Sequence, residues 1–131
     1  MMTEPESGAQ NALRGDILAV GADDFVSMAD VLGLIDDGGL ADSAAERQRL
    51  VVNTIRSLLE EGLVEVGVIP SPSSPGFKTW PGTVDEVMTR FIDRFVAHFD
   101  DRYEWAYKVW LNLTARGREV SAEIAGKASD S

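Results

Sequence analysis

Residues 55–69 read IRSLLEEGLVEVGVI, and this stretch decides the fold class. Its first half places apolar residues at helical spacing, and Gly62 supplies the left-handed backbone conformation that ends many helices. Its second half, Leu63–Ile69, is rich in β-branched residues and stops at Pro70, as a strand does. A helix that continues through a single glycine into a strand predicts a domain of the α+β class.

Short polar signals upstream and downstream of this stretch mark the starts of three helices. In each, a serine or threonine is followed three residues later by an acidic residue, the pattern that caps the free amides of a first turn. The pairs are Ser27 with Asp30, Ser43 with Glu46, and Thr83 with Glu86. The sequence therefore predicts a short second helix that ends at Gly38 and Gly39, a third helix over about 44–62, and a longest helix from Thr83 to about Arg102.

The remaining segments complete an alternating order of elements. Leu13, Ile17 and Leu18 indicate a first helix, and residues 25–26 an extended link. The proline-rich stretch 70–76 is predicted to be an exposed loop, because proline removes ladder hydrogen bonds. Large apolar residues alternate with smaller or polar ones over 105–114, which predicts a half-buried strand, with Trp110 on its outer face.

The length and composition fit one soluble domain. The chain has 131 residues, of which 44% are hydrophobic and 26% charged, and it has no cysteine. We expect a single domain over residues 10–125 with mobile tails at 1–9 and 126–131. Residues 1–10 are polar and acidic rather than basic and then apolar, so no signal peptide is predicted. No apolar run reaches membrane-spanning length, and a cytoplasmic location is expected.

Negative charge is concentrated in the first third of the chain. Residues 1–45 hold nine acidic side chains against Arg14 alone, whereas residues 46–82 are neutral and residues 83–131 carry a net charge of −2. The whole chain has a formal charge of −10. A field of this sign attracts cationic partners and repels nucleic acid at long range.

The order helix, short strand, helix, helix, strand, loop, strand resembles that of a winged helix. Residues 28–34 (MADVLGL) look like the second helix of a helix-turn-helix, and residues 55–65 look like a recognition helix that runs into the wing. Residues 113–119 (LTARGRE) are similar to the strand end and turn that close the wing in regulators of the MarR type. The resemblance implies a three-helix bundle with a small sheet, and here a long extra helix is inserted between the wing strands.

The expected third helix carries the residues suited to reading DNA. Arg49 and Arg56 suit phosphate or guanine, Asn53 suits adenine, and Lys78 is the one base of the expected wing. The same helix face also carries acidic residues, so an ordinary solvated face of mixed charge is the competing interpretation. A regulator of the MarR type would bind DNA as a homodimer, for which the broad apolar stripe of the Val84–Phe99 helix is a candidate interface.

Aromatic residues flank the inserted helix. They are candidates for a partner or ligand surface; in the competing interpretation, Trp80 and Trp105 lock that helix onto the sheet. The residues of this set are Phe77, Trp80, Trp105, Tyr107 and Trp110.

No catalytic, cofactor or metal motif is evident. The chain has no nucleophile elbow, phosphate loop or dinucleotide fingerprint. His98 is the sole histidine, and metal centres usually need more ligands. We expect a protein that is not an enzyme and binds no cofactor or metal.

Three hypotheses for the function follow. The leading one is a regulatory or interaction module that binds a protein with a basic surface, through the acidic first half and the aromatic surface around Trp110. The second is a dimeric DNA-binding transcriptional regulator, which the net charge disfavours. The third is a small-ligand sensor with its pocket between the inserted helix and the sheet.

Overall fold

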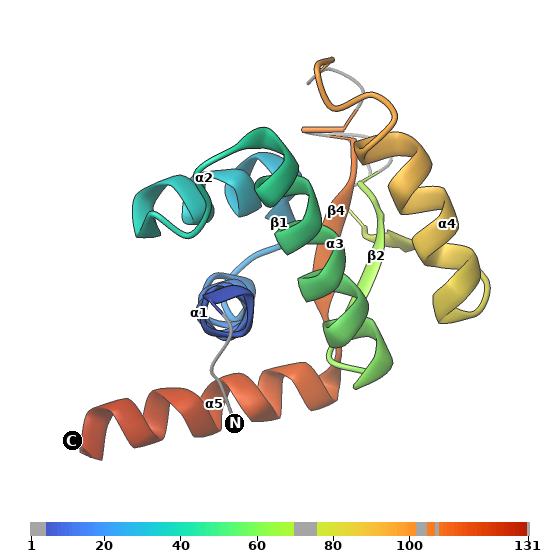
Figure 1. Cartoon of the computed structure of the whole chain (residues 1–131). Coiled ribbons are helices and arrows are strands. Elements are labelled where there is room, and N and C mark those ends of the chain that lie inside the picture. Colours follow the sequence, from blue (N-terminus) through green and yellow to red (C-terminus); the bar gives the residue numbers. More distant parts are fainter. Residues whose placement is uncertain (1–4, 70–75, 102–104, 107, 131) are drawn as a thin grey trace.

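The computed structural model describes residues 5–69, 76–101, 105–106 and 108–130, and it confirms an α+β architecture. In this part of the chain five helices surround a four-stranded antiparallel sheet (Figure 1). The helices are α1 (Pro5–Gly21), α2 (Met28–Gly38), α3 (Ala44–Glu60), α4 (Val84–Phe95) and α5 (Ala115–Asp130). The strands are β1 (Val26–Ser27), β2 (Val64–Val68), β3 (Lys78–Thr79) and β4 (Trp110–Leu113).

The sheet joins segments that lie far apart in the chain. Its strand order is β1-β4-β2-β3, so β4 pairs with both β1 and β2. Leu111 and Leu113 are buried with Val64 and Val66, which lie opposite them on β2, whereas Trp110 and Asn112 alternate on the other face. In Figure 1 α5 runs along one end of the molecule beneath α1, and α3 lies between α1 on one side and α4 on the other.

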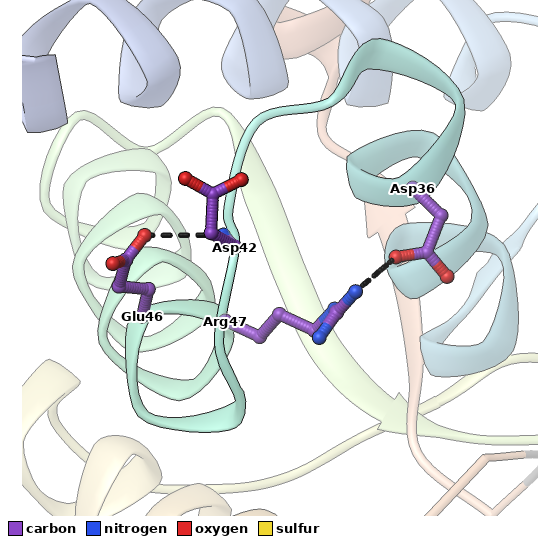
Figure 2. Close-up of polar contacts among 4 residues, drawn as sticks. All are labelled: Asp36, Asp42, Glu46 and Arg47. Atoms are coloured by element: carbon purple, nitrogen blue, oxygen red, sulfur yellow. Dashed lines mark hydrogen bonds and ion pairs between the residues drawn. The ribbon is translucent and has the colours of Figure 1, made fainter.

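Local capping signals are confirmed at two helices and half confirmed at the third. Ser27 and Thr83 each form both hydrogen bonds of a capping box. At α3, Ser43 Oγ accepts from the amide of Glu46 at 3.1 Å, but the Glu46 carboxylate accepts from the amide of Asp42 instead (Figure 2). Ser43 therefore caps α3 as predicted, but Glu46 does not complete a capping box with it.

Glycine ends both α2 and α3 as the sequence predicts. Gly39 and Gly62 adopt φ values of 59° and 72°, in the left-handed region that favours glycine. The amide of Leu63, one residue on, donates to the carbonyl of Leu58, and the chain then enters β2.

The helix predicted to be the longest, α4, has 12 residues and is shorter than α1 and α3, which have 17 each. We expected it to reach about Arg102, but α4 ends at Phe95 and turns follow. The apolar pattern continues past the helix because Phe99, in those turns, packs against Trp105, with ring centroids 5.8 Å apart. The apolar periodicity beyond Phe95 therefore reflects the burial of side chains such as Phe99 and not a continuing helix.

The final strand is also shorter than predicted. The sequence indicated a strand over 105–114, yet β4 spans only Trp110–Leu113. Trp105 and Val109 are buried from a turn, in which the amides of Lys108 and Val109 both donate to the carbonyl of Trp105. The apolar alternation that predicted one strand therefore arises from a buried turn at Trp105 followed by the short strand β4.

The C-terminal helix α5 was not predicted. Residues 113–119, expected as a strand end and turn, are the end of β4 and the first turns of α5. Thr114 Oγ1 accepts from the amide of Gly117, and Ser121 Oγ donates to the carbonyl of Leu18 on α1. The helices α1 and α5 include residues 5–9 and 126–130, which are most of the two stretches that were expected to be tails. Of the predicted proline-rich loop, residues 70–75 lie outside the described residues.

Candidate functional site

Three of the four residues predicted to read DNA lie on α3, and one of these three is held by α4. Arg49 and Asn53 are exposed, whereas Arg56 is half-buried. Arg56 Nη1 lies 3.0 Å from Oδ1 of Asp85, in the first turn of α4, so this guanidinium already has a carboxylate partner. Lys78 is exposed on β3, at the edge of the sheet and on a different element from the other three.

The helix α4 lies along one side of the exposed face of α3. An open groove of about 320 Å³ lies between them. It is lined on α3 by Ala45, Gln48, Arg49, Val52 and Asn53, and on the other side by Ile92 of α4 and Val96, which follows α4. The major groove of DNA is about 12 Å wide and admits one helix of about 10–12 Å diameter. A flanking helix therefore restricts how deeply α3 can enter such a groove.

A second arginine on α3 is also paired. Arg47 donates through Nε and Nη2 to Oδ1 of Asp36 on α2, at 3.1 and 3.0 Å (Figure 2). This contact fixes the turn between α2 and α3. The charge of Arg47 is thereby matched within the chain.

The predicted aromatic surface divides into buried and partly exposed members. Trp80 and Trp105 are 6% and 2% exposed, so they belong to the core and offer no surface to a partner. Trp105 packs against Phe95 of α4 with ring centroids 4.9 Å apart, and its indole Nε1 donates to the carbonyl of His98. Trp80 packs beneath Arg90 of α4, whose guanidinium carbon lies 4.5 Å from the ring centroid. Both tryptophans thus hold α4 in place.

The other members lie toward the outer face of the sheet. Trp110 is half-buried on β4, directly between Ser27 of β1 and Gly67 of β2. A Cβ on Gly67 would lie 2.9 Å from Phe77 Cε2, so the ring of Phe77 occupies the space beside that glycine. Phe77 also contacts Phe25, with centroids 5.4 Å apart. We call Phe25, Phe77 and Trp110 the aromatic face; Tyr107 lies outside the described residues.

A groove that the sequence did not predict adjoins the aromatic face. It has a volume of about 320 Å³ and lies between the C-terminal end of α1 and α2. We call it the α1–α2 groove. Its apolar lining is Val20, Phe25, Ala29, Gly33 and Leu34, and its acidic lining is Asp24, Asp30 and Asp37. Phe25 belongs to both the groove and the aromatic face, so the two surfaces are continuous.

The three carboxylates of this groove are exposed, and none forms an ion pair within the part of the chain that is described. Asp30 accepts from the amide of Ser27 at 3.1 Å, and Asp24 from the amide of Phe25 at 2.7 Å. These bonds orient the side chains, and Arg118 lines an adjoining pocket with Asp24 without forming an ion pair to it. The charge count over residues 1–45 indicated this acidity, but the place of Val20 and Leu34 beside it depends on how α1 packs on α2.

His98 is exposed, and the described residues contain no group of three or more side chains suited to holding a metal. In the same part of the chain, no helix has the length and apolar character needed to cross a membrane.

Comparison of the chain with protein-family models, curated proteins and solved structures finds no match.

Proposed function

We propose that this protein is a non-enzymatic regulatory or interaction module of winged-helix type that binds a protein with a basic surface. Support for the winged-helix assignment comes from the order of elements. Helix α1, strand β1, helices α2 and α3 and strand β2 follow in the expected order, and a late strand, β4, closes the sheet by pairing with β1 and β2. The element that departs from the order of a winged helix is α4, which lies in the chain between β3 and β4.

The single observation that carries the functional proposal is where the unmatched charge lies. Asp24, Asp30 and Asp37 surround an apolar groove without a cationic partner among the described residues. On α3, in contrast, Arg47 and Arg56 are paired with carboxylates. A protein interface needs apolar contact area together with complementary charge, and the α1–α2 side supplies both.

The exposed positions of Arg49 and Asn53 on α3 favour a second candidate, the dimeric DNA-binding regulator. Its proposed dimer interface, the stripe on residues 84–99, is largely used within the chain. Val87, Met88, Phe91 and Phe95 of this stripe are buried.

A paired titration separates these candidates. We would measure fluorescence anisotropy with a labelled lysine-rich peptide and with a mixed-sequence DNA duplex, each at about 50 mM and about 200 mM salt. We expect the peptide to bind and to weaken with salt, and the DNA not to bind at either concentration. DNA binding that weakens with salt and is lost in Arg49→Ala and Arg56→Ala would overturn the proposal in favour of the regulator, and absence of peptide binding would overturn it outright.

A further inference from the structure

We propose, building on the proposed function, that the α1–α2 groove receives one large apolar side chain from a lysine- or arginine-rich segment of the partner protein. The flanking cations of that segment would lie against Asp24, Asp30 and Asp37. Each part of this assignment rests on a different feature of the groove.

The apolar lining is open to a partner. Val20 is 36% exposed, and only Ile124 joins it as an exposed large hydrophobic residue in the described part of the chain. Phe25 and Leu34 are half-buried and face the same groove. Burying these side chains against a partner removes apolar surface from water, which is the main source of favourable association energy. The groove, of about 320 Å³, is large enough to receive one large apolar side chain.

The glycine in this lining has no role in packing within the chain. Gly33 lies inside α2, where glycine is less favourable than alanine. A Cβ at this position would meet no atom within 4 Å, and its φ is not positive. Nothing in the fold of the chain itself requires glycine here. The missing side chain leaves space in the groove, which a partner's side chain would use.

The charge around the groove selects the class of occupant. Three carboxylates repel anions, so fatty acids, anionic lipid surfaces and nucleic acids are disfavoured at this site. Lysine and arginine side chains match it, because exposed pairs of opposite charge add orientation and speed of association. The groove therefore fits an apolar residue set between basic residues, and a basic segment without an apolar residue would use only half of the site.

Two labelled peptides and two matched variants test this assignment. The peptides are Lys-Lys-Ser-Lys-Leu-Lys-Ser-Lys-Lys and the same sequence with serine in place of the central leucine. The variants are Gly33→Gln, which fills the groove, and Gly15→Gln on α1. Gly15 is also inside a helix with open space at its Cβ, but it does not line the groove. Circular dichroism and thermal unfolding would establish that both variants fold.

We expect the wild-type protein and Gly15→Gln to bind the leucine peptide about fivefold more tightly than the serine peptide. Gly33→Gln should bind both peptides with equal affinity, because the glutamine side chain occupies the space that the leucine would fill. Equal binding of both peptides by the wild-type protein would overturn the groove assignment and leave the basic-partner proposal standing. A leucine preference that survives in Gly33→Gln would also overturn the groove assignment. If neither peptide binds, both the groove assignment and the basic-partner proposal are overturned.

Discussion

Two sets of apolar side chains in this molecule differ in what covers them. Around α4, the rings of Phe95, Phe99 and Trp105 pack on one another, and Phe95 and Trp105 are almost fully buried. At the α1–α2 groove, Val20 and Leu34 stay partly exposed. The nearest carboxylates differ in the same way, since Asp85 of α4 is paired with Arg56, whereas Asp37 forms no ion pair with any described residue.

This difference separates stability from recognition. Side chains that fill a contact from within the chain contribute to the free energy of folding, and their loss is costly. Side chains left open beside unmatched charge contribute little to folding and are available to another molecule. The α4 side should therefore respond to mutation through stability, and the α1–α2 side through binding.

The largest effect is expected from Phe95→Ala. Removing this fully buried ring leaves a cavity against Trp105, and we expect the free energy of unfolding to fall by about 3–5 kcal/mol. Leu34→Ala, at the open groove, should cost only about 1 kcal/mol. Urea denaturation of both variants measures this, and equal losses would show that the groove is as important to folding as the α4 contact.

A smaller effect, on binding alone, is expected from the double variant Asp24→Asn with Asp37→Asn. Two exposed charges are removed from the groove, so affinity for the leucine peptide should fall by about 1 kcal/mol, or roughly fivefold. The matched control is Asp93→Asn with Glu119→Gln, which removes the same charge from exposed sites on α4 and α5. Anisotropy titration at low salt compares them, and equal weakening by both would show that only net charge matters.

A gain in stability of similar or smaller size is expected from Gly33→Ala. Alanine is the more favourable residue inside a helix, and its Cβ meets no neighbour here, so the free energy of unfolding should rise by about 0.5–1 kcal/mol. Thermal unfolding reports this change. A loss of stability would mean that the glycine serves packing within the chain after all.

The smallest effect concerns Glu86 at the start of α4. Hydrogen bonds from Thr83, first from its backbone amide and then from its side chain, hold the pKa of Glu86 below its ordinary value of 4.5. A carboxyl with a lowered folded pKa contributes stability that is present above pH 4.5 and is lost as pH falls through the folded pKa. Unfolding of the wild-type protein and Glu86→Gln between about pH 6 and about pH 3 should show the weaker pH dependence in the variant. Identical pH profiles would contradict this role.

The elements with local signals were predictable from the sequence. Ser27 and Thr83 cap helices with a neighbour three residues away, and Gly62 ends one, so each signal depends on a few adjacent residues. The helix α5 was missed because the residue three positions after Thr114 is Gly117 and not an acidic residue, so the capping pattern is absent. A Cβ on Gly117 would collide with the carbonyl oxygen of Leu63, so this glycine serves a close contact between α5 and the chain before β2 and not a turn.

The candidate site was predictable only in its charge. The acidic composition of residues 1–45 indicated which part of the chain would attract a cation. Whether Asp30 or Asp36 stays unmatched depends on tertiary contacts, because Arg47 reaches Asp36 across the turn between α2 and α3. The aromatic set divided in a similar way. The core positions of Trp80 and Trp105 agree with the interpretation that these two residues lock the inserted helix in place, whereas the contact of Phe77 with Phe25 was not predicted.

Chemical-shift mapping decides between the two sides of the molecule. Isotope-labelled protein would be titrated with the leucine peptide, and the backbone amide shifts followed by NMR. We predict the largest changes at Val20, Phe25 and Leu34, which line the α1–α2 groove. Changes concentrated at Arg49, Asn53 and Val96, between α3 and α4, would contradict the assignment of partner binding to the acidic side.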